Sequence, residues 1–414
     1  MAQRPGGPDP RRKPRMINPG SLANLRVIDA SRVLGGPYAG QILADHGADV
    51  VKLEPPAGDE TRGWGPPFLG DAASYFLGLN RNKRGIAVDL SQEMGRELLL
   101  ALLEDADVLI ENFKTGTMER WGLGQDELAR RFPRLVHCRV SGFGADGPMG
   151  GLPGYDAAIQ ALCGIMSVNG EAGGQPLRVG LPVVDMVTGL NATIGILMAL
   201  SERATSGKGQ FVETSLYDCG VSLLHPHLPN YYLSGRVAGP SGNAHPNICP
   251  YDTFATGTEP IFLAVGNDRQ FATLCAMIGR PDLPQDARFA SNSQRNIHRD
   301  ALKAALEAAL SAFDCAGLSD RLIKAGVPCG AVRSIDQVIA DPHTIHREMV
   351  VDIGEYRGTG SPIKLSRTPA SYRRAPPGFA QHTGEVMAER ALDPDSYREV
   401  LPGPDPEQNA ARKA

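Results

Sequence analysis

The chain has no strong excess of charge of either sign. Its 42 lysines and arginines nearly balance 46 aspartates and glutamates, and the formal net charge is −4 over 414 residues. Nucleic-acid-binding proteins usually present a basic surface that attracts phosphates, so this composition disfavours a nucleic-acid partner. An anionic ligand would have to be met by a local group of basic side chains.

Long uncharged hydrophobic runs are also missing. The longest candidate, residues 186–200, contains Thr188, Asn191 and Thr193, whereas a membrane-spanning helix needs about 20 mostly apolar residues. No membrane span is therefore expected. Residues 1–20 are rich in Pro, Gly and Arg and carry no apolar core of a secretory signal, so we expect a disordered arm there. Residues 401–414 are expected to form a frayed tail.

Paired cysteines are absent too. The chain has seven cysteines, an odd number, and none of them forms a C-x-x-C pair. This spacing argues against a zinc site and against a disulfide framework. We therefore expect no metal site and a location in the reducing cytoplasm.

What the sequence does contain is an alternation of short apolar strands with helices. Strand-like segments at 25–30, 49–54, 84–90, 107–112 and 135–142 are separated by helical patterns. This alternation is typical of α/β proteins with a parallel sheet covered by helices on both faces. The first strand is followed by A-S-R-V-L-G-G-P instead of G-x-G-x-x-G, which disfavours a dinucleotide-dependent dehydrogenase.

Composition also predicts two domains, since 414 residues can bury two cores. Residues 21–224 would form the first part of a large α/β domain. Residues 225–249, rich in Pro, His, Asn and Gly, are expected to be a linker. Residues 250–326, with one short strand and Ala/Leu helices, would form a smaller α+β domain.

Two acids stand in a Gly-rich, apolar stretch in mid-chain. Asp185 follows Pro182 and two valines and opens a helical run with no further acid until Glu202. A charge there is costly to desolvate, so it is expected to be paired or reactive. An Asp at this position is equally favourable as a helix N-cap, and the helix dipole would keep it ionised in either role. Asp156, before the segment AAIQAL, is open to the same two interpretations.

Several motifs resemble one known family. The pattern G-Y-D-x-x-x-Q-A, then P-x-x-D-x-x-x-G-L-x-A-x-I-G-I-L-x-A-L, then G-x-G-Q, is similar to the class III (CaiB/BaiF) CoA-transferases. The likeness runs from about residue 25 to about residue 386. Further similar stretches occur in the same order at 26–68, 80–90, 110–124, 242–254, 265–271 and 327–350.

The resemblance implies an architecture. It implies a Rossmann-like large domain, a smaller α+β domain, and a segment 327–400 that links back and completes the large domain. It also implies a homodimer whose two subunits are interlocked like rings.

The resemblance also implies a chemistry. The substrates would be an acyl-CoA and a free carboxylic acid, with coenzyme A as substrate and product and no tightly bound cofactor. In the family the Asp of P-x-x-D is the nucleophile, which is Asp185 here, and Asp156 matches an acidic site residue. Attack on the thioester would give a mixed anhydride and then an aspartyl-CoA thioester, so that one difficult step becomes several easier ones.

Contacts to CoA are implied by family position. Arg120 would otherwise be a solvated helix charge, and the turn at Gly35 would otherwise simply precede a helix. Lys52 is a further candidate. The run 80–85 (NRNKRG) is either only a basic loop or a loop that steers the 3′-phosphate. The candidate CoA-binding residues are Leu34, Gly35, Val88, Asn112, Phe113, Lys114, Arg120 and Tyr155.

Departures from the family pattern narrow the substrate. The formyl-CoA/oxalate branch has Gln where this chain has Leu34, and a glycine run where this chain has HPNIC, so oxalate chemistry is disfavoured. The segments around 58–68 and 74–90 are closer to the succinyl-CoA:dicarboxylate branch. Arg32, Arg62 and His245 are candidates for holding an acyl carboxylate, or are ordinary surface or ion-pairing residues.

Two alternative functions remain open at this level. A 2-methylacyl-CoA racemase of the same fold would carry His in G-H-D, where this chain has Tyr155. Tyrosine titrates near pH ~10 and is a poor base at neutrality, which favours transfer over racemisation. A catalytically silent acyl-CoA-binding protein would have lost the nucleophile, and the retained Asp185 argues against it.

Overall fold

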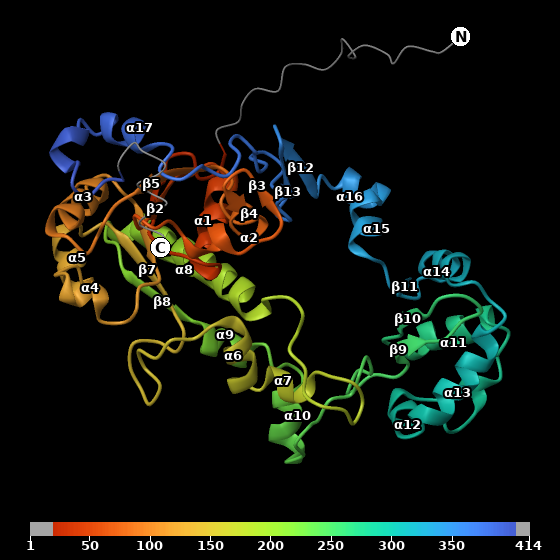
Figure 1. Cartoon of the computed structure of the whole chain (residues 1–414). Coiled ribbons are helices and arrows are strands. Elements are labelled where there is room, and N and C mark those ends of the chain that lie inside the picture. Colours follow the sequence, from red (N-terminus) through yellow and green to blue (C-terminus); the bar gives the residue numbers. More distant parts are fainter. Residues whose placement is uncertain (1–19, 403–414) are drawn as a thin grey trace, which may run out of the picture. The chain divides into compact units, whose positions relative to one another are not determined.

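The computed structural model describes residues 20–402 (Figure 1). These residues form two compact units. The first unit comprises residues 20–159, 182–219 and 345–402, and the second comprises residues 160–181 and 220–344. The predicted N-terminal arm and C-terminal tail lie outside the described residues, apart from residues 20, 401 and 402.

The first unit is built on a six-stranded parallel sheet. Counted along the chain, its strands are arranged 3-2-1-4-5-6, the doubly wound order of Rossmann folds. The predicted α/β class with a parallel, Rossmann-like sheet is confirmed. In spatial order the strands are β5 (Lys83–Ala87), β2 (Asp49–Glu54), β1 (Arg26–Asp29), β6 (Val108–Glu111), β7 (Val136–Ser141) and β8 (Phe211–Ser215).

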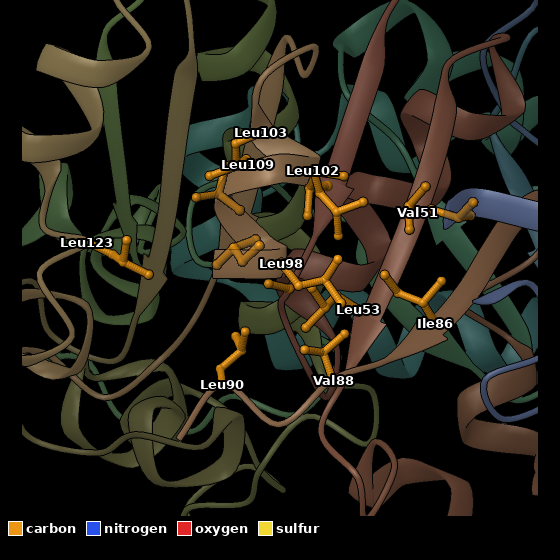
Figure 2. Close-up of a cluster of buried hydrophobic side chains, with 14 of the residues drawn as sticks. Val51, Leu53, Ile86, Val88, Leu90, Leu98, Leu102, Leu103, Leu109 and Leu123 are labelled. Carbon is orange, nitrogen blue, oxygen red and sulfur yellow. The ribbon is translucent and has the colours of Figure 1, made fainter. Parts of the chain in front are cut away.

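One face of this sheet is an apolar core. Successive strand residues point to opposite faces, and Val51, Leu53 and Ile86 share the face that packs on α3 (Glu93–Leu103). Figure 2 shows these side chains meeting the leucines of α3, including Leu98 and Leu102. Residues from α4 (Thr117–Arg120), α5 (Gln125–Arg131), α17 (Thr383–Ala388) and η3 (Pro394–Tyr397) complete the cluster.

The opposite face carries two helices that pack against each other, α1 (Gly35–Asp45) and α8 (Val183–Ser206). The 24-residue α8 is longer than the apolar run 186–200 that the sequence suggested. By length and composition alone α8 could cross a membrane, which the sequence analysis did not anticipate. Its buried residues recur at helical spacing, with Val184, Thr188, Ala192 and Ile196 on one side.

Short elements complete the first unit. The hairpins β3 (Phe68–Leu69)–β4 (Ala72–Ala73) and β12 (Val350–Ile353)–β13 (Tyr356–Thr359) are antiparallel. A one-turn helix η1 (Glu60–Gly63) and α2 (Ser74–Leu77) lie between β2 and β5 in the chain. The chain crosses between the two units four times: within α6 (Asp156–Leu162), between residues 181 and 182, and within α9 (Leu216–Ser222) and α16 (Pro342–His346).

The second unit has its own core around a three-stranded antiparallel sheet, β11 (Cys329–Ala331), β10 (Ile261–Ala264) and β9 (Tyr251–Phe254). Phe254, Leu263, Phe271, Leu306 and Leu322 belong to this core. Its remaining helices are α7 (Ile165–Val168), α10 (His227–Ser234), α11 (Asp268–Met277), η2 (Leu283–Gln285), α12 (Asn292–Ile297), α13 (Arg299–Leu310), α14 (Cys315–Lys324) and α15 (Ile335–Ala340).

The unit boundaries differ from the predicted domain boundaries. Residues 160–181 pack with the second unit although the sequence assigned them to the large domain. The predicted linker 225–249 belongs to the second unit and contains α10. The chain re-enters the first unit at residue 345, within the segment 327–400 that was expected to link back to the large domain.

Candidate active site

A cavity of about 250 Å³ opens in the first unit where the strand order reverses. Ligands of open α/β sheets bind at this crevice, outside the carboxyl ends of the strands. The loops after β1, β6 and β7 line the cavity together with the start of α8. Its lining residues are Arg32, Val33, Leu34, Gly35, Glu60, Asn112, Phe113, Lys114, Thr115, Val140, Ser141, Gly142, Gly151, Leu152, Pro153, Gly154, Tyr155, Asp185 and Leu216.

Asp185 lies in the first turn of α8, is only 8% exposed and lines the cavity. Its carboxylate makes no hydrogen bond within the described part of the chain. The start of α8 is capped instead by Asp156. Its Oδ2 accepts hydrogen bonds from the backbone nitrogens of Val184 at 2.8 Å and Asp185 at 3.1 Å. Helix starts leave such amides without partners. Of the two acids, Asp156 therefore caps α8, whereas Asp185 lines the cavity and does not act as the cap.

Burial, reinforced by the negative charge of Asp156, raises the pKa of Asp185 to about 7. At neutral pH this carboxyl group is therefore poised between its two protonation states. Burial together with Asp185, Asp156 and Asp59 raises the pKa of Tyr75 to about 12, so its phenol stays neutral. The sequence analysis did not single out Tyr75, whose ring packs edge-on against Trp64.

The loop after β1 forms one wall of the cavity and lies next to Asp185. Its Arg32 backbone is held from both sides by Asn112, which accepts from the Arg32 nitrogen at 2.9 Å and donates to the Arg32 carbonyl at 2.8 Å. Val33 has a φ of 70°, which is strained for a β-branched residue. Leu34 and Gly35 follow, and a side chain at Gly35 would sit 3.5 Å from the Asp185 carbonyl.

A second cavity of about 230 Å³ lies beside the ends of β1, β2 and β5. It shares Arg32 and Phe113 with the first cavity, and the predicted CoA contact Val88 lines it. Phe113 packs edge-on against Trp121, with ring centroids 5.3 Å apart. Its lining residues are Ala30, Arg32, Leu53, Pro55, Pro56, Val88, Asp89, Leu90, Ser91, Phe113 and Trp121.

Most of the candidate CoA-binding residues line one of the two cavities. Leu34, Gly35, Asn112, Phe113, Lys114 and Tyr155 line the first cavity. Arg120 lines neither of them; it is exposed on α4 and donates to the Thr117 hydroxyl at 2.8 Å. Exposure fits both a solvated helix charge and a contact to a CoA phosphate, so both interpretations of Arg120 stay open.

Two of the three candidate carboxylate-binding residues are not among the residues that line the first cavity. Arg62 is buried and forms a two-point ion pair with Glu54, at 2.8 and 2.7 Å, so its charge is already neutralised. His245 belongs to the second unit, where burial and the positive charge of Arg299 lower its pKa, so it carries no charge at neutral pH. Arg32 alone of the three lines the cavity.

The run 80–85 and Lys52 are buried, whereas the sequence analysis treated them as candidates for contact with CoA. Asn80, Arg81, Asn82, Lys83 and Arg84 are each at most 3% exposed, and Lys52 is fully buried. A phosphate in solvent cannot reach these side chains. The hypothesis of a phosphate-steering surface loop is therefore wrong.

Several cavity residues escaped the sequence analysis. Ser141 and Gly142 follow β7 directly, so the position of a polar residue after a strand could have indicated them. Glu60 and Leu216 carry no such signal, because long-range packing brings them to the cavity. All seven cysteines are free thiols. In the described residues no group of three or more His, Cys, Asp or Glu side chains could hold a metal ion.

Comparison with known proteins places these features in a family. Residues 22–383 match the model of CoA-transferase family III. A succinate–glutarate CoA-transferase from Agrobacterium fabrum is 39% identical over 392 residues, covering 92% of this chain and 96% of the relative. An acetyl-CoA:oxalate CoA-transferase from Acetobacter aceti is 40% identical over 349 residues, covering 84% of this chain and 90% of the relative.

A solved structure agrees with these matches. The crystal structure of a CaiB/BaiF family protein from Brucella suis superimposes with a TM-score of 0.80 at 40% identity, and covers 90% of this chain and 99% of that one. The chain belongs to CoA-transferase family III. It is accordingly a CoA-transferase, with coenzyme A among its substrates.

Proposed function

We propose that this enzyme moves CoA between carboxylic acids through a covalent intermediate on Asp185, with a short dicarboxyl-CoA such as succinyl-CoA as donor. One observation carries the proposal. Asp185 is almost completely buried and lines the cavity, and its carboxylate is not occupied by capping, because Asp156 accepts from the amides of α8. A poorly solvated carboxylate is a stronger nucleophile than one in water.

The proposed steps need no net proton transfer. The Asp185 carboxylate attacks the thioester carbonyl and expels CoA thiolate, leaving a mixed anhydride. The thiolate attacks the Asp185 carbonyl and releases the donor acid, which leaves an aspartyl-CoA thioester. The acceptor carboxylate attacks this thioester and expels thiolate. The thiolate then attacks the acceptor carbonyl of the new anhydride, which forms the product acyl-CoA and frees Asp185.

The two cavities suit the two ends of an acyl-CoA. In this proposal the apolar second cavity, with Phe113 and Trp121, receives the nucleotide end. The first cavity receives the thioester beside Asp185. Arg32 lines both and is the cation available to a CoA phosphate or to a second carboxylate of the acyl group.

Dicarboxylic substrates are supported by the relatives. The Agrobacterium and Acetobacter proteins are named for succinate with glutarate and for acetyl-CoA with oxalate, so each name includes at least one dicarboxylic acid. Arg32 and Lys114 bring positive charge into the cavity wall. Leu34 in place of Gln remains our reason to rank oxalyl-CoA below succinyl-CoA as donor.

The proposal includes an interlocked homodimer in the cytoplasm, acting away from membranes and without a tightly bound cofactor. Exposed apolar residues on α8 support a partner surface: Leu190, Ile194 and Met198 are 40%, 48% and 67% exposed and follow each other one helical turn apart. Seven free thiols support a reducing compartment.

The decisive experiment traps the intermediate. Incubation with succinyl-CoA and no acceptor, followed by hydroxylamine, should leave a hydroxamate on Asp185 that peptide mass spectrometry places between Gly180 and Leu190. An adduct on Asp156 would reverse the two roles. A racemase or a silent binding protein would give no adduct. In addition, the racemase would exchange the α-proton of a 2-methylacyl-CoA with deuterium from the solvent.

A further inference from the structure

Four fully buried charged side chains, none of which lines the cavity, form two ion pairs near strands β1 and β2. Lys52 Nζ lies 2.8 Å from Asp59 Oδ2, and Lys83 Nζ lies 2.8 Å from Asp29 Oδ2. All four side chains are 0% exposed. Burying an ammonium group costs several kcal/mol and is offset only by good pairing. Because no solvent reaches these groups, their role cannot be direct contact with CoA.

Lys52 differs from Lys83 in the segments of the chain that its ammonium group connects. Its ammonium donates both to the Ser31 carbonyl and to the Asp59 carboxylate. Ser31 directly precedes the cavity-lining loop 32–35, and Asp59 directly precedes the cavity residue Glu60. One buried cation therefore joins two segments of the chain that wall the cavity.

On the side of the loop 32–35, the hydrogen bond from Lys52 to the Ser31 carbonyl holds a strained turn. Asp29 also holds Ser31, by accepting from its backbone nitrogen at 3.1 Å and from its hydroxyl. Two residues later Val33 has its φ of 70°, a strained conformation that persists only where the surroundings enforce it. Gly36 packs so closely that a side chain there would meet the Ser31 hydroxyl oxygen at 2.3 Å.

On the side of Asp59, the ion pair with Lys52 holds the residue that caps η1. Asp59 caps this short helix by accepting from the nitrogen and the hydroxyl of Thr61 at 3.0 and 2.8 Å. Its own backbone nitrogen donates to Glu54 at 2.8 Å. Glu60, held between these contacts, reaches the cavity, where the Tyr155 hydroxyl lies 3.5 Å from it.

The Lys52–Asp59 pair stays ionised over the working pH range. Burial alone would lower the pKa of Lys52, but Asp59, Asp29 and Glu54 outweigh it and raise that pKa above its usual value. Burial likewise opposes ionisation of Asp59, yet Lys52 and the bonds to Thr61 lower its pKa to about 2. The tie therefore does not open or close as Asp185 titrates near pH 7.

We propose that Lys52 is a positioning residue for CoA transfer: through the Ser31 carbonyl and Asp59 it fixes both cavity walls, so that the acyl carbonyl meets Asp185 at attacking distance. This inference rests on the proposed role of Asp185. Lys52 touches no reacting atom. A displacement of about 1 Å at a reacting centre can cost about 100-fold in rate, so loosening the walls should slow the chemical steps more than it weakens binding.

The test compares two substitutions of buried cations. Lys52→Met keeps the length of the side chain and removes the ammonium group. Arg203→Met is the control, because Arg203 is 8% exposed, pairs with Asp107 at 2.7 Å, and lies about five turns along α8 from Asp185. Measured for each are kcat, KM for succinyl-CoA, the rate of hydroxamate formation on Asp185, and the midpoint of thermal unfolding.

We expect Lys52→Met to lower kcat and the trapping rate about 10- to 100-fold, with KM changed less than about threefold. Arg203→Met should lower the unfolding midpoint but leave kcat within about twofold. Unchanged kcat in Lys52→Met, or an equal loss in the control, would overturn the proposal. If wild-type enzyme transfers CoA but gives no adduct, the nucleophile assignment fails, and kcat still decides the role of Lys52.

A second variant tests the proposal even if Lys52→Met fails to fold. Asp59→Asn removes the charge that Lys52 meets but keeps an oxygen for the Thr61 cap. We expect a smaller loss of kcat than in Lys52→Met, and a double variant that is barely slower than Lys52→Met alone, because both changes break one tie. Fully additive losses would show that Lys52 does not act through Asp59.

Discussion

The Asp156 carboxylate oxygen Oδ2 lies 3.1 Å from the backbone nitrogen of Asp185 and accepts its hydrogen bond. The same oxygen accepts from Val184, so a residue 29 positions earlier in the chain supplies the cap of α8. The Asp156 charge also contributes to the raised pKa of Asp185. Asp156 thus caps the helix start that carries Asp185 and adds to the effect of burial on the pKa of Asp185.

The pH dependence of transfer should report the ionisation of Asp185. Only the carboxylate can attack a thioester, and its pKa is about 7. We therefore expect kcat to rise with pH through about 7 and to level off above it. Initial rates from pH 5 to 9 with saturating succinyl-CoA measure this. A flat profile down to pH 5 would mean that the reacting carboxyl is not this one.

Asp185→Asn should separate activity from stability. The variant has no attacking anion, so transfer should fall by several orders of magnitude while CoA binding remains. The free energy of unfolding of this variant should be higher than that of the wild type. Folding raises the pKa of Asp185, so the wild-type carboxyl destabilises the folded protein as the pH rises from about 4, where it ionises in the unfolded chain, to about 7. Above pH 7 the gain would reach at most about 4 kcal/mol. Urea unfolding at pH 4 and pH 8 tests the sign.

Lower stability of Asp185→Asn at pH 8, with most activity kept, would instead identify Asp185 as a structural residue. An ordinary N-cap contributes about 1 kcal/mol. That outcome would contradict both the nucleophile assignment and the unpartnered state of its carboxylate.

Asp156→Asn should shift the pH profile of transfer. The amide oxygen can still accept from the α8 backbone, since Asn is nearly as good a cap as Asp. Loss of the negative charge should lower the pKa of Asp185, so the midpoint of the kcat profile should move below 7. Transfer at pH 8 should fall less than in Asp185→Asn. An unmoved midpoint would show that the two carboxyl groups do not interact.

Donor preference tests the dicarboxylate proposal. A panel of acyl-CoA donors against free acids, analysed by mass spectrometry, should show succinyl-CoA or another short dicarboxyl-CoA donating better than formyl- or oxalyl-CoA. The physical reason is the positive charge of Arg32 and Lys114 in the cavity wall, together with Leu34 in the turn. Equal or faster turnover with oxalyl-CoA would contradict this ranking.

Assembly can be tested on the exposed side of α8. Interlocked subunits cannot separate without unfolding, so sedimentation velocity at nanomolar concentration should show a dimer only. Ile194→Asp with Met198→Asp places two charges in the apolar stripe and should prevent a stable dimer if a second copy covers it. Glu202→Gln, an exposed change farther along α8, is the control. A folded, active wild-type monomer would refute interlocking.

The sequence predicted the features that depend on local pattern. The strands at 25–30, 49–54 and 107–112 are apolar and bounded by turns, and the structure has β1, β2 and β6 there. Asp185 was identifiable because it interrupts an apolar run at a helix start. The weak strand β8 was not identified, since its residues Phe211–Ser215 are mostly half-buried and lack a clear period.

What the sequence could not supply were partners far along the chain. Lys83 belongs to a charged run that looks solvent-exposed, yet it opens β5 and meets Asp29, 54 residues earlier. From the sequence, Arg62 was a candidate for binding a carboxylate of the substrate. In the structure its guanidinium pairs with Glu54 and donates to the Pro377 carbonyl. Such pairings depend on the order of strands in the sheet, which composition and periodicity do not encode.

The strand order has a consequence for how this enzyme can change. The residues that line the first cavity come mostly from separate loops after β1, β6 and β7, while the strands of the sheet carry the core. Substitutions in these loops can therefore alter the acid that is accepted without disturbing the scaffold. The Agrobacterium and Acetobacter relatives, named for different acids, are almost equally similar to this chain at 39% and 40% identity. Overall divergence is thus a poor guide to acid preference, and a few loop positions deserve comparison first.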